Sequence, residues 1–244
     1  MNKNLIFTST CLVYLIPLTL LTGSFLPDLF ICTVAILTTF LIIKEKKYKY
    51  YNNYYFYIFI IFCIYLILRS FSAKSVILSL ESSLFYFRFG LFAIGVWYLL
   101  DNNNKLIKNF SIFLALTFIF ALLDGYYQFF YETSIFGFNY PGTRLSLSLN
   151  DKAMLGGYLA RLFPLLLAVF IYSFDLKKSY LFFVLLILIL TDVLIFISGE
   201  RTALGLLFLS TVFIIIFLSK YKKVRLFTFL FLILIMVFLA MFNP

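Results

Sequence analysis

Five of the six arginines in this chain fall outside its lysine-rich segments, where only Lys74 and Lys152 accompany them, and they are the side chains best suited to bind an anion. A guanidinium offers a planar fork of N–H donors that holds phosphate or carboxylate in bidentate fashion and cannot lose its proton. A lysine suffices where only a solvated charge near a membrane surface is needed. The separation therefore predicts a site for an anionic ligand. The five residues are Arg69, Arg88, Arg144, Arg161 and Arg201.

The segment Ser198–Ala203 places two charged residues inside a long apolar stretch that runs from Leu181 to Leu218. This stretch is too long for one membrane span and suits two. The Ser-Gly pair predicts a turn between two helices, with Glu200 and Arg201 at its apex. A turn does not need a charged pair, so we interpret Glu200 and Arg201 as functional.

Arg88 and Arg161 fall within apolar segments, where a charge costs at least ~2–3 kcal/mol unless it faces a polar cavity or a partner. Pro164 would open the helix beside Arg161. Both arginines could instead snorkel or pair internally and so hold helices together. The candidate partners are Asp124, Asp151, Asp192 and Glu200.

Other kinds of chemistry are poorly represented. The chain contains no His, which removes the commonest general base and the commonest metal ligand. The three cysteines lie isolated in apolar segments without a CxxC spacing, so we interpret them as small buried apolar residues. No metal or other cofactor is expected. The net charge of +10 is typical of cytoplasmic loops in a membrane protein and does not indicate a nucleic-acid partner.

The elements that position these residues follow from the composition. Hydrophobic residues make up 64% of the 244 residues and charged residues only 12%, against about 25% charged in soluble domains. Long unbroken apolar runs exclude soluble enzymes, disordered chains, secreted disulfide scaffolds and outer-membrane barrels. The sequence predicts an all-α polytopic bundle of about nine membrane helices. The expected spans are 5–22, 25–43, 54–68, 84–100, 110–130, 153–172, 180–197, 203–219 and 226–242.

The basic residues predict which side of the membrane each connection faces. If the spans alternate, thirteen of the 20 basic residues share one side, which is then cytoplasmic. The N-terminus is therefore expected inside, and 131–152 and 198–203 outside. Helical spacing of apolar residues in 69–83 predicts a short amphipathic helix on the outer interface. We expect one membrane domain over 1–244. The thirteen inside residues are Lys3, Lys44, Lys46, Lys47, Lys49, Lys105, Lys108, Lys177, Lys178, Lys220, Lys222, Lys223 and Arg225.

Two outside motifs, taken in order, resemble a known family. The first opens at Arg144, continues through Asp151 and a Gly-Tyr-Leu stretch, and reaches Arg161. The second is Ser-Gly-Glu-Arg-Thr-Ala at 198–203. This order resembles the O-antigen ligase and O-antigen polymerase superfamily of bacterial inner-membrane transferases. The resemblance covers roughly 130–215 in detail and the rest of the chain only in hydropathy.

The resemblance implies metal-independent transfer of a glycan from a polyprenyl diphosphate carrier at the periplasmic face of the bacterial inner membrane. The acceptor would be lipid A core or another lipid-linked glycan, and membrane lipids would be the other partners. Guanidinium groups would bind the diphosphate and stabilise it as the leaving group. The implied catalytic residues are Arg144, Arg201 and Glu200. The implied substrate-binding residues are Arg161, Asp151 and Arg88. Glu200 or Asp151 would orient the acceptor hydroxyl.

The chain departs from the family pattern in two respects. Ligases of this family carry a functional His in a large outside loop, and family members have about twelve spans. We therefore expect a C-terminally truncated member, with a chain that works together with another subunit or an inactive chain as the alternatives. The missing His favours a polymerase over a ligase. Two other functions stay open. One is a transporter or flippase for an anionic lipid-linked substrate, and the other is a non-catalytic truncated membrane protein. The transporter pathway would be lined by Arg88, Arg161, Asp124 and Asp192.

Overall fold

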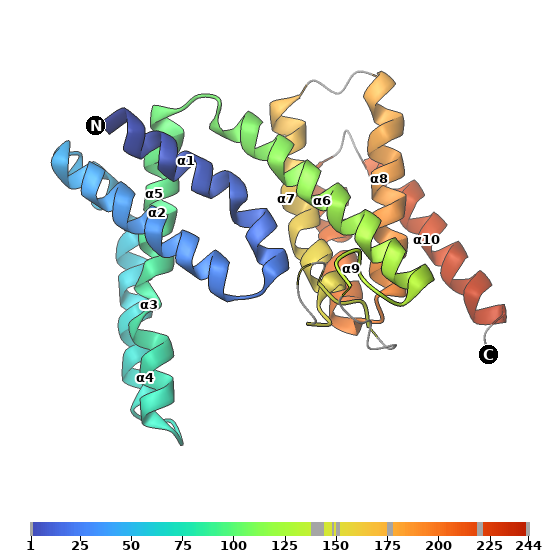
Figure 1. Ribbon diagram of the computed structural model, residues 1–244, viewed down its shortest axis with the longest axis horizontal. Helices are drawn as coiled ribbons and strands as arrows, with labels where there is room; N and C mark the ends of the chain where they lie inside the picture. The colour runs from blue at the N-terminus through green and yellow to red at the C-terminus, as the bar shows by residue number, and fades with distance from the viewer. Residues whose placement is uncertain are drawn as a thin grey trace. The chain divides into compact units, whose positions relative to one another are not determined.

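The computed structural model describes residues 2–137, 144–147, 149, 152–174, 178–218 and 222–242, without the side chains of 178–185, 224 and 235–242 (Figure 1). Across these residues the chain forms α-helices and two short 3-10 helices, and no β-strand, which confirms the predicted all-α class. The α-helices are α1 (Asn2–Thr19), α2 (Phe25–Lys44), α3 (Tyr54–Ser70), α4 (Val76–Leu84), α5 (Phe87–Asn102), α6 (Leu106–Tyr131), α7 (Leu155–Ser173), α8 (Lys178–Ile197), α9 (Arg201–Phe217) and α10 (Lys222–Phe242).

Several helices have the length and composition of membrane spans, as expected for a membrane protein. Among the described residues, five stretches are long and apolar enough to cross a bilayer. The remaining predicted spans fall on α3, α8, α9 and α10, whose described apolar stretches are shorter, so the count of nine spans stays a prediction. The five stretches are Asn2–Thr22, Phe25–Lys44, Val76–Asn102, Leu106–Tyr131 and Leu155–Ser173.

The chain divides into two compact units, and the prediction of one membrane domain over 1–244 stays a prediction. Unit 1 comprises residues 1–16 and 24–107. In it α2 packs along α5, and α3 packs beside α4. Of the segment predicted as an amphipathic helix over 69–83, residues 69–70 end α3, residues 71–75 form a turn, and α4 begins at Val76. Its apolar run continues into α5 as one long apolar stretch.

Unit 2 comprises residues 17–23 and 108–244 and carries the core that positions most of the candidate residues. Leucine and phenylalanine side chains of α7, α8 and α9 are fully buried there, among them Leu159, Phe163 and Leu194. The Tyr158 hydroxyl donates to the Pro17 carbonyl at 2.9 Å. The predicted Ser-Gly turn between α8 and α9 is confirmed. Gly199 adopts a φ of 71°, a left-handed conformation that glycine takes without strain.

Candidate functional site

Arg144 is positioned by a buried network beneath the loop that carries it. Gln128 of α6 accepts hydrogen bonds from the N–H (3.0 Å) and the hydroxyl (3.1 Å) of Ser146, and donates to the Ser146 carbonyl at 3.1 Å. Gln128 also donates to Asp124 at 2.6 Å, and the other Asp124 oxygen accepts from the Ile135 N–H at 2.8 Å. Asp124, Gln128 and Ser146 are fully buried. The backbone at Ser146 is therefore fixed, and Arg144 lies two residues before it with an exposed side chain.

Glu200 caps a helix to which it does not belong. α7 begins at Leu155 without a hydrogen bond from an N-cap side chain, so its first N–H groups need other partners. The Glu200 carboxylate is buried and accepts from the Gly157 N–H at 3.0 Å. A Cβ at Gly157 would lie 3.0 Å from this carboxylate, and a Cβ at Gly156 would meet Ser198 and Glu200, so the two glycines provide the necessary space. The contact joins the N-termini of α7 and α9 and places a negative charge at the positive end of α7.

Two arginines act on Glu200 through space. Burial raises the pKa of Glu200 above its ordinary value of 4.5, and the charges of Arg144 and Arg161, together with the α7 N–H groups, oppose that rise. Arg161 lies in the second turn of α7, and Arg201 follows Glu200 as the first residue of α9. All three arginine side chains are exposed, and none forms an ion pair or hydrogen bond within the described residues. Their charges are therefore available to an external anion.

A cleft of about 510 Å³ opens between α7 and α9 next to these residues. Its polar side chains are Arg161 and Ser210, and the rest of its lining is apolar. The N-termini of both helices meet at Glu200, so Arg161 lies near that end of the cleft. The α9 part of the lining continues from Leu206 to Phe217, roughly 16 Å along the helix axis at 1.5 Å per residue. The cleft thus offers a positive charge at one end and an apolar wall along its length. The apolar lining residues are Ala160, Pro164, Leu206, Leu209, Phe213, Ile214, Phe217 and Leu218.

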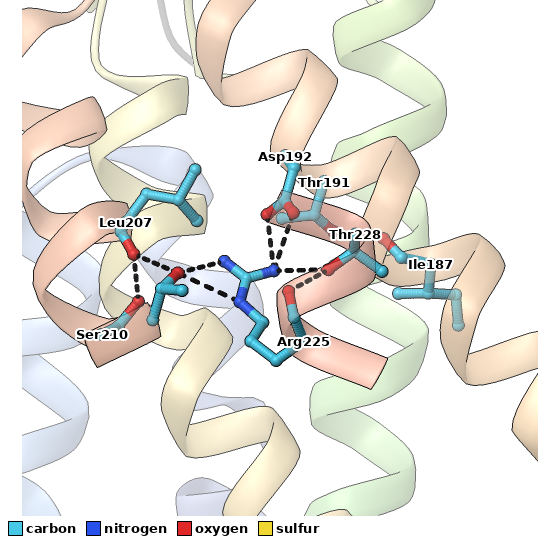
Figure 2. A network of polar contacts seen from close by, with 8 residues as sticks. Ile187, Thr191, Asp192, Leu207, Ser210, Arg225 and Thr228 are labelled. Atoms are coloured by element: carbon cyan, nitrogen blue, oxygen red, sulfur yellow. Dashed lines mark hydrogen bonds and ion pairs between the residues drawn. The ribbon is translucent and has the colours of Figure 1, made fainter. Parts of the chain in front are cut away.

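Arg225 of α10 is buried at the centre of a polar network that Figure 2 shows. Its Nη1 donates to both carboxylate oxygens of Asp192, at 3.0 and 2.7 Å. Its Nε and Nη2 donate to the Thr211 hydroxyl at 3.0 and 2.6 Å, and the Thr228 hydroxyl accepts from Nη1 at 3.3 Å. The ring of Phe163 lies 4.7 Å from the guanidinium carbon. One side chain therefore joins α7, α8, α9 and α10.

One prediction is wrong at this network, and another stays a prediction. Arg225 was assigned to the inside face by its position in the chain, and that assignment stays a prediction, but its side chain is buried because the fourth residue of α10 points into the bundle. Asp192 is not the partner of Arg88 or Arg161, because Arg225 takes both of its oxygens. One sequence signal did exist, since Arg225 is the single arginine among twelve lysines in the set assigned to the inside.

Arg88 belongs to unit 1 and pairs with Asp28 of α2, an acid that was not among its predicted partners. Its Nη2 lies 2.8 Å from the Asp28 carboxylate, and both side chains are partly exposed. The guanidinium also lies over the ring of Phe89, with the central carbon 4.9 Å from the ring centroid. The alternative that Arg88 pairs internally is therefore confirmed, with a different acid.

The remaining acidic candidates divide into two groups. Asp124 is committed to the loop network, and Asp192 to Arg225, so a transport pathway lined by these carboxylates has no support in the described residues. Asp151, predicted to bind substrate, lies outside the described residues, as do Lys177 and Lys220 of the inside set.

Glu200 therefore lies with Arg144 and Arg161 at the start of α7, and Arg201 follows it in the chain. In the part of the chain that the structure describes, no three acidic or cysteine side chains gather in a way that could hold a metal ion. Comparison with family models, with curated proteins and with solved structures gives no match to this chain.

Proposed function

We propose that this chain is a glycosyltransferase of the O-antigen ligase and polymerase type. It would move a glycan from a polyprenyl diphosphate carrier to lipid A core or to a growing lipid-linked polysaccharide, at the periplasmic face of the bacterial inner membrane. The proposal rests on the resemblance of the two outside motifs and on one structural observation. Arg144 and Arg161, from separate segments, act on one buried carboxylate beside an apolar cleft.

The shape and charge of this site suit an amphiphile with an anionic head. A polyprenyl diphosphate carries two phosphates on a long apolar chain. The head would bind the exposed guanidiniums of Arg144, Arg161 and Arg201, in bidentate fashion where the geometry allows. The chain would lie against the apolar walls of α7 and α9, where Leu206–Phe217 provides the length. Glu200 leaves the site positive overall, because three arginines outnumber one carboxylate.

In the reaction, the acceptor hydroxyl oxygen forms a bond to the anomeric carbon of the donor glycan. The bond from that carbon to the diphosphate breaks, and its electron pair leaves with the diphosphate oxygen. The hydroxyl proton passes to solvent. The arginines stabilise the negative charge that develops on the leaving group, which is the stage at which fixed positive charge lowers a barrier most.

Glu200 takes a positioning role in this scheme. Its carboxylate is buried and accepts a hydrogen bond from the Gly157 N–H, so it holds the start of α9, and with it Arg201, against the start of α7. The same carboxylate keeps a negative charge beside Arg144 and Arg161, which limits the repulsion between the two guanidiniums when no substrate is bound.

The test is a binding measurement on the purified chain in neutral detergent, with undecaprenyl diphosphate, undecaprenyl monophosphate and undecaprenol as probes. The affinity should rise with the number of phosphates, from undecaprenol to the monophosphate to the diphosphate. Arg144→Ala, Arg161→Ala and Arg201→Ala should each weaken diphosphate binding by about 10- to 100-fold, since a hydrogen bond to a charged group contributes about 1.5–3 kcal/mol.

Lys223→Ala is the matched control, because it removes an exposed positive charge from unit 2 at the start of α10, away from the candidate residues. It should leave the affinity within about twofold of wild type, as expected for a distant, solvent-screened charge. Equal binding of undecaprenol and undecaprenyl diphosphate would contradict the proposal, and so would equal losses in Lys223→Ala and the three arginine variants.

A further inference from the structure

A second polar pocket lies in unit 1, between the C-terminal end of α3 and one face of α4, with a volume of about 380 Å³. Ser79, Ser82 and Ser83 follow one another at helical spacing, which puts their side chains on the same side of α4, and Tyr86 lies two residues beyond the end of this helix. Hydroxyl groups and one guanidinium dominate the lining. The lining residues are Leu66, Arg69, Ser70, Ser79, Ser82, Ser83 and Tyr86.

Four of the five hydroxyl groups of this pocket divide into two sets, and the fifth, on Ser82, donates to the Leu78 carbonyl at 3.3 Å. Ser70 and Ser83 are buried and join the two helices, since the Ser70 hydroxyl donates to the Ser83 hydroxyl at 2.9 Å. By contrast, the hydroxyls of Ser79 and Tyr86 and the guanidinium of Arg69 make no hydrogen bond or ion pair within the described residues. These groups supply a positive fork and two hydroxyl donors to whatever occupies the pocket.

The charge of the pocket is positive. None of its lining residues is acidic. The nearest acid along α4 is Glu81, which is exposed and lies two positions from both Ser79 and Ser83, so it belongs to a different face of the helix. Arginine with hydroxyl donors and no carboxylate is a donor set that matches a phosphate group.

The surroundings of the pocket are apolar and exposed. Leu68 and Phe71 beside it on the α3 side are 63% and 61% exposed, and Ile77 and Leu78 on the α4 side are 83% and 66% exposed. Such a patch is an interaction surface in a soluble protein and a lipid-facing surface in a membrane protein. A polar pocket rimmed by lipid-facing side chains suits a molecule whose head is polar and whose chains are apolar.

The position of the pocket along α3 agrees with headgroup depth. α3 is 17 residues long, about 25 Å at 1.5 Å per residue, and begins just after the lysine-rich segment Lys44–Lys49. Lysines of this kind mark one membrane surface. A hydrocarbon core of about 30 Å then puts Arg69, near the end of α3, close to the opposite headgroup layer.

We propose that this pocket, formed by Arg69, Ser79, Ser82 and Tyr86, binds the phosphate headgroup of an anionic membrane lipid whose acyl chains lie along the exposed faces of α3 and α4. This site belongs to unit 1 and uses none of the residues of the transferase site, so it stands or fails independently of that proposal.

The experiment is native mass spectrometry of the whole chain, released from a neutral detergent that contains equal amounts of phosphatidylglycerol and an uncharged glucosyl diacylglycerol. The wild-type chain should retain phosphatidylglycerol in preference. Arg69→Ala should lower its occupancy about tenfold, which corresponds to ~1.4 kcal/mol. Ser79→Ala combined with Tyr86→Phe should lower it at least about fivefold, as expected for the loss of two neutral hydrogen bonds.

Lys74→Ala is the matched control, because Lys74 is an exposed cation close to Arg69 in the chain and outside the pocket lining. Its retention of phosphatidylglycerol should equal that of wild type, and the melting temperature of Arg69→Ala should be unchanged. Equal retention in Arg69→Ala and Lys74→Ala would overturn the proposal. Equal retention of the uncharged lipid would also overturn it. Binding of millimolar inorganic phosphate without retention of phosphatidylglycerol would overturn the assignment to a lipid.

Discussion

Removing one partner of the Asp192–Arg225 pair should destabilise unit 2 strongly, whereas removing both should not. The perturbations are Asp192→Leu, Arg225→Met and the double variant, which keep similar volumes without the charges. Both side chains are almost completely buried, at 0% and 1% exposure. A charge left without its partner at such a position keeps its desolvation penalty and loses the attraction that offset it.

The size of the effect follows from the contacts. Breaking a buried ion pair on one side costs about 3–5 kcal/mol. The loss in Asp192→Leu should lie at the upper end of this range, because the guanidinium of Arg225 cannot lose its proton. Its remaining partners are the hydroxyls of Thr211 and Thr228 and the ring of Phe163. Arg225→Met should cost less, because a lone Asp192 can bind a proton. The double variant should return to within about 2 kcal/mol of wild type.

The assay is reversible unfolding of the purified chain in mixed detergent micelles, titrated with SDS and followed by far-UV circular dichroism. The double-mutant cycle should give a coupling of at least about 2 kcal/mol, because neighbouring charges do not act additively. Losses of unfolding free energy below about 1 kcal/mol in the single variants, typical of an exposed pair, would show that the pair does not behave as a buried one. So would a double variant whose loss equals the sum of the two single losses.

The same unfolding assay checks three further predictions. Glu200→Ala should lower the free energy of unfolding by about 1–2 kcal/mol, because the start of α7 loses its cap. Glu200→Gln keeps a hydrogen-bond acceptor and should lower it less. Because burial raises the folded pKa of Glu200 above 4.5, the stability that this group contributes is complete below pH 4.5 and falls as pH rises through the folded pKa. Glu200→Gln should lack that fall, and the same pH slope in both proteins would contradict the assignment. Gln128→Ala should lower the free energy of unfolding by about 2–3 kcal/mol, since it leaves the buried N–H and carbonyl of Ser146 unpaired. A loss below about 0.5 kcal/mol, the usual size for a surface substitution, would contradict the role of the network. The partly exposed Arg88–Asp28 pair should show a coupling below about 1 kcal/mol, and a larger value would contradict its surface character.

The fold class could be predicted from the sequence because the bilayer permits few solutions. Long apolar runs must be helical in a membrane, since every backbone polar group needs an internal partner. The Ser198–Gly199 turn was predictable for a similar reason, because a left-handed residue at a helix end favours glycine. The helix predicted over 69–83 begins only at Val76, because a turn at 71–75 separates it from α3, and the spacing of apolar residues does not show where one helix ends and the next begins.

The candidate site could be predicted only in part. Exposed arginines can be picked out by residue type, and the charges of both Arg144 and Arg161 do act on Glu200. The ion pairs could not be assigned, because sequence distance carries no information on which acid meets which base across a bundle. Arg225 was placed among surface lysines by position, although its residue type set it apart. The cap formed by Glu200 on α7 joins residues 43 apart in the chain, a contact that no local pattern reveals.

The most direct test of the central claim is the transfer reaction itself. The chain is reconstituted in liposomes with a polyprenyl diphosphate oligosaccharide and with either lipid A core or a second lipid-linked oligosaccharide. The liposomes are incubated with EDTA, and the products are identified by mass spectrometry. We expect a transferred glycan and free polyprenyl diphosphate in equal amounts, both lost in Arg144→Ala and Arg201→Ala and both kept in Lys223→Ala. A wild-type chain that binds the donor and yields neither product, or whose products survive both arginine substitutions, would contradict this claim.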